Sequence, residues 1–226
     1  PLIETMHDEE RREAHRLLLK SVYVNIKDLD RYIRFTMLTG VSRFSKMTIF
    51  SGLNNLKDIS LNRNYAAICG ITDSELTGNF QQGIERFAEE YSTDHDGAVA
   101  LLKANYDGYH FAKASPDIYN PFSILNAFDD GEIGSYWFKS GTPEFLIRQI
   151  RKGGNFLPEM FDETVEESVI SDIDISQKTP TALLYQTGYL TIKEFEEPDL
   201  FRLGIPNLEV RQGLFKSLAR YYLNED

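Results

Sequence analysis

Apolar residues at helical spacing mark the first part of the chain. Between residues 8 and 29 the apolar positions recur at intervals of three and four, with charged residues on the opposite face, which predicts a helix. The next apolar run predicts a strand over 32–39, buried from Phe35 to Leu38. Helix and strand in this order are typical of one unit of a parallel sheet, which needs neighbouring strands and cover on both faces. The apolar positions of the helix are Leu18, Leu19, Val22, Ile26 and Leu29.

Capping signals predict a run of helices between residues 72 and 152. Thr72 and Glu75 form a capping box at the start of a helix that ends near Tyr91. Asn120-Pro121 and Thr142-Pro143 are typical helix starts, because the first side chain accepts bonds from free N–H groups and proline fits the first turn. The helices predicted after the first one cover 94–106, 121–129 and 143–151.

Two further strands are predicted on either side of this helical region. One is a short strand over 58–61, and the other covers 169–175. The second lies inside the acidic, loop-like segment 153–178, which we interpret as a connector.

The pattern after the connector predicts a small mixed unit. A short helix follows Thr179-Pro180 and stops at Gly188. The arms 189–195 and 200–204 then flank Glu-Glu-Pro-Asp and predict a hairpin. Asn207 caps a last helix with apolar residues on one face. Helix, hairpin and closing helix are typical of a winged-helix unit. The apolar face carries Val210, Leu214, Leu218 and Tyr221.

Composition describes a folded, acidic protein. The 226 residues are 42% apolar and 12% aromatic, which is enough for a hydrophobic core. The net charge of −11 repels phosphate backbones and disfavours non-specific nucleic-acid binding. A single cysteine, Cys69, excludes an internal disulfide and fits a reducing compartment. With no signal peptide and no apolar run near the length of a membrane span, we expect a cytoplasmic protein without membrane contact.

Hydroxyl and basic side chains gather at the end of the strand predicted over 32–39. Thr39, Ser42, Arg43 and Lys46 follow its carboxyl end, where ligands bind in open α/β sheets. These donors suit an anionic group such as a phosphate. An ordinary polar loop remains the alternative, because no formal motif matches.

Several stretches, spread from Pro1 to about Leu223, resemble the bacterial AAA-ATPase-like family of P-loop proteins. In that family, common in gut Bacteroidetes, a P-loop and a strand ending in Asp-Glu precede the segment similar to residues 1–6, and a restriction-endonuclease-like module often follows. The resemblance implies an α/β remnant with a partial parallel sheet, a mainly α-helical lid and a C-terminal winged helix, predominantly helical overall. The stretches are Arg34–Ser60, Tyr65–Leu76, Asn105–Phe111, Tyr119–Leu125 and Tyr136–Phe145.

The resemblance also implies four parts. They are the C-terminal part of an ATPase core (1–71), a helical lid (72–152), the acidic connector (153–178) and the winged-helix-like unit (179–226).

The same resemblance assigns the polar cluster to the nucleotide. It implies that Arg43 and Ser42 act in catalysis and that Thr39, Ser42, Arg43 and Lys46 face the nucleotide in the intact protein, whose cofactors would be ATP and Mg²⁺. No Gly-Lys pair occurs in these 226 residues, so no P-loop motif can be written. We therefore expect a fragment downstream of the P-loop that senses nucleotide and couples it to other parts, without ATPase activity or tight cofactor binding of its own. We expect no metal site, and the missing P-loop segment is its first partner.

Other functions stay open at this point. A winged-helix module without an ATPase role would bind DNA or protein, and Arg211, Lys216 and Arg220 give the last helix a modest basic face. Nucleic-acid contact is expected only there. Asp107 and His110 would centre a hydrolase, but a structural role in the turn after the 94–106 helix explains them as well.

Three consecutive aromatic residues, Tyr136, Trp137 and Phe138, cannot all point to one side of a helix or strand. We therefore predict that at least one of them joins the lid to the winged helix.

Overall fold

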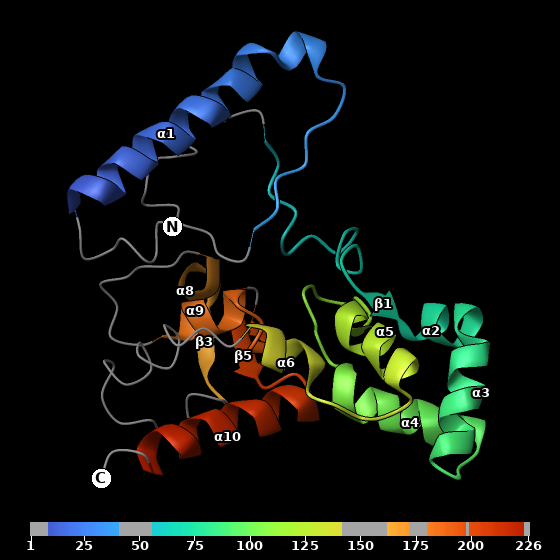
Figure 1. Cartoon of the computed structure of the whole chain (residues 1–226). Coiled ribbons are helices and arrows are strands. Elements are labelled where there is room, and N and C mark those ends of the chain that lie inside the picture. The colour runs from blue at the N-terminus through green and yellow to red at the C-terminus, as the bar shows by residue number, and fades with distance from the viewer. Residues whose placement is uncertain (1–8, 41–55, 142–161, 172–179, 198, 224–226) are drawn as a thin grey trace.

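The computed structural model describes residues 9–40, 56–141, 162–171, 180–197 and 199–223. Its first element, α1 (Glu9–Asp28), confirms the predicted N-terminal helix. Figure 1 shows α1 set apart from the remaining elements. No helix among the described residues is long and apolar enough to cross a membrane.

The strand predicted over 32–39 is wrong. A single 3₁₀ turn, η1 (Asp30–Tyr32), follows α1, and residues 33–40 form neither helix nor strand. Phe35, expected in a buried strand, is 79% exposed. A strand requires a neighbour for its N–H and C=O groups, and none of the described residues pairs with this segment. The described strands pair only in antiparallel fashion, so the parallel sheet is not found among them.

The strand predicted over 58–61 is also wrong. The segment turns at Ser60, whose N–H donates to Asp58 Oδ1 at 2.9 Å. The asparagines and aspartates of such loops often bond their own backbone in this way, which competes with strand pairing.

The middle of the chain is helical, as the caps predict. The capping box of Thr72 and Glu75 is present, but the expected helix breaks at Phe80, whose φ of −116° is not helical. Asn120 Oδ1 accepts from the N–H groups of Phe122 and Ser123, as a helix cap does. The helices are α2 (Asp73–Asn79), α3 (Gln81–Glu90), α4 (His95–Tyr106), α5 (Pro121–Asp130) and α6 (Tyr136–Gly141). The helix predicted over 143–151 lies outside the described residues.

These helices enclose a hydrophobic cluster that we call the first core. The two-residue antiparallel ladder between β1 (Ile71–Thr72) and β2 (Ile118–Tyr119) contributes Tyr119 to it. The first core consists of Leu76, Ile84, Phe87, Ala88, Ala98, Leu102, Tyr106, Tyr119, Ile124 and Ala127.

The C-terminal part is a three-stranded antiparallel sheet with helices around it. The predicted hairpin and closing helix are present, and Asn207 caps that helix by accepting from Val210 N–H at 3.1 Å. The strand predicted over 169–175 is wrong for residues 169–171, because they belong to α8 and the strand β3 comes just before that helix. Residues 172–175 lie outside the described residues. The sheet order is β3-β5-β4. The elements are β3 (Thr164–Glu166), α8 (Glu167–Ser171), α9 (Thr181–Gln186), β4 (Thr191–Glu197), β5 (Leu200–Gly204) and α10 (Leu208–Leu223).

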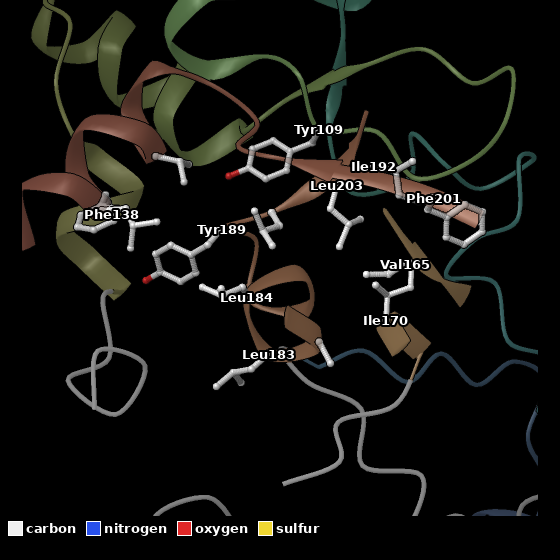
Figure 2. Packing of buried hydrophobic residues seen from close by; sticks show 14 of the residues in the cluster. Tyr109, Phe138, Val165, Ile170, Leu183, Leu184, Tyr189, Ile192, Phe201 and Leu203 are labelled. Atoms are coloured by element: carbon white, nitrogen blue, oxygen red, sulfur yellow. The ribbon is translucent and has the colours of Figure 1, made fainter. Parts of the chain in front are cut away.

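The two parts of the molecule share a hydrophobic cluster. This second core takes most of its side chains from residues 165–218, but Tyr109, Ile118 and Phe138 enter it from the helical part. Figure 1 shows α6 between the other helices and the C-terminal sheet, and Figure 2 shows Phe138 facing Tyr189 inside the cluster. The C-terminal residues of the second core are Val165, Ile170, Ala182, Leu183, Leu184, Tyr189, Leu190, Ile192, Phe201, Leu203, Val210, Leu214 and Leu218.

Candidate functional site

The structure describes one residue of the predicted nucleotide-facing cluster. Thr39 lies exposed in the extended segment after η1. Ser42, Arg43 and Lys46 lie outside the described residues. The site assigned to them therefore stays a prediction.

A second candidate lies at the turn after α4, residues 107–110. Gly108 has a φ of +98°, in the left-handed region that glycine adopts without strain. A Cβ at this position would collide with the carbonyl oxygen of Pro206. Lys193 Nζ donates to the carbonyl oxygens of both Pro206, at 3.1 Å, and Gly108, at 3.4 Å. The turn is thereby held against β4 and against the segment that leads into α10.

Asp107 is a buried acid at the start of this turn. Its side chain is only 5% exposed, and Oδ2 lies 3.8 Å from Lys103 Nζ. Its Oδ1 has no hydrogen-bond partner among the residues that the structure describes. Burial raises the pKa of the Asp107 carboxyl, and the N–H of Gly108 opposes this shift. A buried acid with a raised pKa and an unused oxygen is a feature of functional sites.

Lys103 connects this acid to the start of α2. Its Nζ lies 3.6 Å from Asp73 Oδ1, which also accepts from the Tyr119 hydroxyl at 2.8 Å. Burial raises the pKa of that hydroxyl, and its bond to Asp73 adds to the shift. Asp73, Lys103 and Asp107 therefore form one charged cluster across α2, α4 and the turn.

His110 fastens the other end of the turn. Its Nδ1 lies 2.8 Å from Asp117 Oδ1, so its carboxylate partner is Asp117 rather than Asp107. Its backbone N–H donates to Thr191 Oγ1 at 2.8 Å, and that hydroxyl lies 3.1 Å from the His110 carbonyl oxygen. These contacts support the structural role of His110 and give no support to an Asp107–His110 hydrolase.

The aromatic contact predicted between the two parts is confirmed. The ring centroids of Trp137 and Tyr189 lie 5.3 Å apart, and those of Phe138 and Tyr189 lie 5.8 Å apart. Phe138 is 6% exposed. Tyr189 follows α9, so α6 packs directly on the C-terminal part.

Metal ligation has no support in the described residues. No group of three or more His, Cys, Asp or Glu side chains is arranged there to hold a metal ion. The turn at 107–110 brings charged side chains together and fixes the helical part of the molecule against the C-terminal part.

Sequence reasoning missed the long-range partners of the turn. Thr191 and Lys193 are separated from it by 81 and 85 residues, as their bonds to His110 and Gly108 show. Both occupy a predicted strand, where threonine and lysine are ordinary. No local signal distinguishes them.

Gly108→Ala is expected to destabilise the protein by about 1–3 kcal/mol, because alanine is strained at positive φ and its Cβ meets Pro206. Gly78→Ala in α2 is the matched control, since nothing lies within 4 Å of its added Cβ. That variant is expected to be more stable by about 0.5–1 kcal/mol. Urea denaturation of both measures the difference. Equal stability of the two variants would contradict the close packing of the turn.

Residues 1–50 match the family model described as predicted AAA-ATPase. An uncharacterised protein in the vnfD 5′ region of Azotobacter chroococcum mcd 1 is 35% identical over 228 residues, covering 100% of this chain and 42% of that protein. The chain thus spans less than half of that relative's length. No solved structure matches. Residues 1–50 thus match the AAA-ATPase-like family that the sequence resembles.

Proposed function

We propose that this chain is the nucleotide-sensing and coupling part of a bacterial P-loop ATPase. The observation that carries the proposal is the AAA-ATPase match at residues 1–50, because that segment contains Thr39, Ser42, Arg43 and Lys46. In the intact protein the Arg43 guanidinium, with the Ser42 hydroxyl beside it, would face the γ-phosphate. A positive group placed there stabilises the charge that develops during phosphoryl transfer. ATP and Mg²⁺ are the proposed cofactors of the intact protein.

The exposed apolar surface of the N-terminal segment supports this proposal. Leu18 is 64% exposed, Val22 53% and Phe35 79%. A helix of a soluble protein normally buries its apolar stripe against another element. We propose that the P-loop segment of the intact ATPase covers these side chains.

The connection between the helical and C-terminal parts supports the coupling role. The turn at 107–110 and the rings of Trp137 and Phe138 fasten the proposed lid to the C-terminal sheet. Movement of the lid would therefore carry the C-terminal part with it. A restriction-endonuclease-like module after this part remains a proposed partner.

We further propose that α9, the β4–β5 hairpin and α10 form a winged helix, with β3 as its third strand. Nucleic-acid contact through α10 is the alternative function, and the exposure of Arg211 and Lys216 favours it. The net charge of −11 opposes it. Duplex binding with a log-linear salt dependence would support this alternative.

The chain itself is expected to show no micromolar binding of Mg-ATP in calorimetric titration, because it contains no Gly-Lys pair and hence no phosphate-cradling P-loop. The matched measurement uses the intact protein, which is expected to bind Mg-ATP. Micromolar binding by the 226-residue chain would contradict the proposed location of the nucleotide site. An intact protein that neither binds nor hydrolyses ATP would overturn the proposed function.

A further inference from the structure

A buried carboxylate crosses the boundary between the two parts of the molecule. Glu209, in the first turn of α10, is 4% exposed. Its Oε2 accepts from the Ser123 hydroxyl of α5 at 2.6 Å, and its Oε1 accepts from the Phe138 N–H of α6 at 3.3 Å. The N–H groups of Trp137 and Tyr136 stabilise the same charge. One side chain thus holds three helices together.

These bonds offset the cost of burying a charge. Burial raises the pKa of the Glu209 carboxyl, and bonds from Ser123 and from the first turn of α6 oppose this shift. A buried carboxylate is tolerated only when its oxygens accept enough hydrogen bonds. The N–H groups at the start of α6 also need an acceptor, because a helix leaves its first N–H groups unpaired. Separating α10 from α5 and α6 would leave the Glu209 carboxylate without its donors and the first N–H groups of α6 without their acceptor.

The hydrogen bonds of Glu209 lie between the first and the second core. Ser123 precedes Ile124, which belongs to the first core. Glu209 precedes Val210, which belongs to the second core. A Cβ added to Gly213 would collide with the Phe138 ring, so α6 lies directly against α10. The carboxylate is therefore a polar link where the two cores meet, in addition to the bonds of Thr191 and Lys193 to the turn at 107–110.

We propose that Glu209 is a conformational latch that makes the helical and C-terminal parts unfold and move as one unit. Apolar contacts alone allow two packed surfaces to slide or part, whereas a buried carboxylate with directed partners has one satisfied arrangement. When the latch is broken, the C-terminal part is expected to separate from the first core before the helices around that core unfold. This role of Glu209 is independent of the proposed nucleotide role of residues 39–46.

Trp137 provides a local probe of the latch. It is the single tryptophan of the chain and contacts Tyr189 across the boundary. Its fluorescence therefore reports separation of the two parts, whereas far-UV circular dichroism reports loss of helix throughout the chain. Urea denaturation of the whole chain, followed by both signals, tests the proposal.

In the unsubstituted chain the two signals are expected to change at one midpoint. In Glu209→Ala the fluorescence midpoint is expected to fall below the circular dichroism midpoint by roughly 1 M urea, because several buried donors lose their acceptor. Glu209→Gln keeps a carbonyl oxygen at the same position. Its fluorescence and circular dichroism midpoints are therefore expected to lie much closer together than those of Glu209→Ala. Glu85→Ala, at an exposed position of α3, is the matched control and should leave both midpoints unchanged.

Two results would overturn the latch. The first is separate midpoints in the unsubstituted chain, and the second is a Glu209→Ala variant whose two midpoints shift by equal amounts or stay in place. If Glu209→Ala does not fold, Ser123→Ala carries the test, because it removes only one donor. Coincident midpoints in Ser123→Ala would then overturn the proposal. A fluorescence midpoint below the circular dichroism midpoint, by less than is expected for Glu209→Ala, would support it.

Discussion

Replacing Arg43 with alanine in the intact protein is expected to slow ATP turnover by about 10²-fold or more while leaving nucleotide affinity nearly unchanged. The expectation rests on the proposed position of the guanidinium at the γ-phosphate. Removing a group that acts mainly in the transition state lowers kcat. Removing a group that binds the substrate equally well in the ground state raises KM instead. Steady-state ATPase kinetics, with nucleotide affinity measured separately, distinguish the two.

Arg63→Ala is the matched control for this measurement. Arg63 has the same side chain and is exposed in the turn region before β1, outside the proposed nucleotide-facing cluster. Its replacement is expected to leave turnover unchanged. Unchanged turnover in Arg43→Ala would show that Arg43 is an ordinary surface residue and would refute its proposed role.

Phe138→Ala is expected to lower the free energy of unfolding by about 3–5 kcal/mol, the usual cost of removing a buried phenyl ring. The ring is 6% exposed, belongs to the second core and lies edge-on to Tyr189. Its removal leaves a cavity where α6 packs on α10. Urea denaturation of the 226-residue chain measures the loss.

Phe122→Ala provides the control for the size of this effect. Phe122 lies in α5 and is 48% exposed, so its removal leaves no closed cavity. It is expected to cost less than about 1 kcal/mol. Equal losses in the two variants would show that Phe138 does not anchor the two parts to each other.

Local sequence determined the helices and many of their ends. Several predicted caps accept hydrogen bonds from N–H groups within the next three residues. These capping residues are Thr72, which is paired with Glu75, Asn120, which precedes Pro121, and Asn207. Such bonds depend on neighbours in sequence, and so they can be read without knowledge of the rest of the fold. The β4–β5 hairpin was predictable for a similar reason, since its two arms are joined by a short turn. The break at Phe80 was missed, because one residue with a non-helical φ left no mark in the apolar pattern.

Tertiary structure decided most of the contacts that join distant segments. The apolar run at 32–39 has the composition of a strand, but a strand exists only where another segment pairs with it, and none of the described residues does. The acidic segment before α9 supplies β3, because residues 164–166 find a partner in β5. Glu209 followed a helix cap, where an acidic residue is ordinary, and only the meeting of α5, α6 and α10 made it a buried acceptor. The run of three aromatic residues at 136–138 predicted one long-range contact, because its rings cannot all point to one side. The other contacts between distant residues depend on how the elements pack, and no local pattern predicted them.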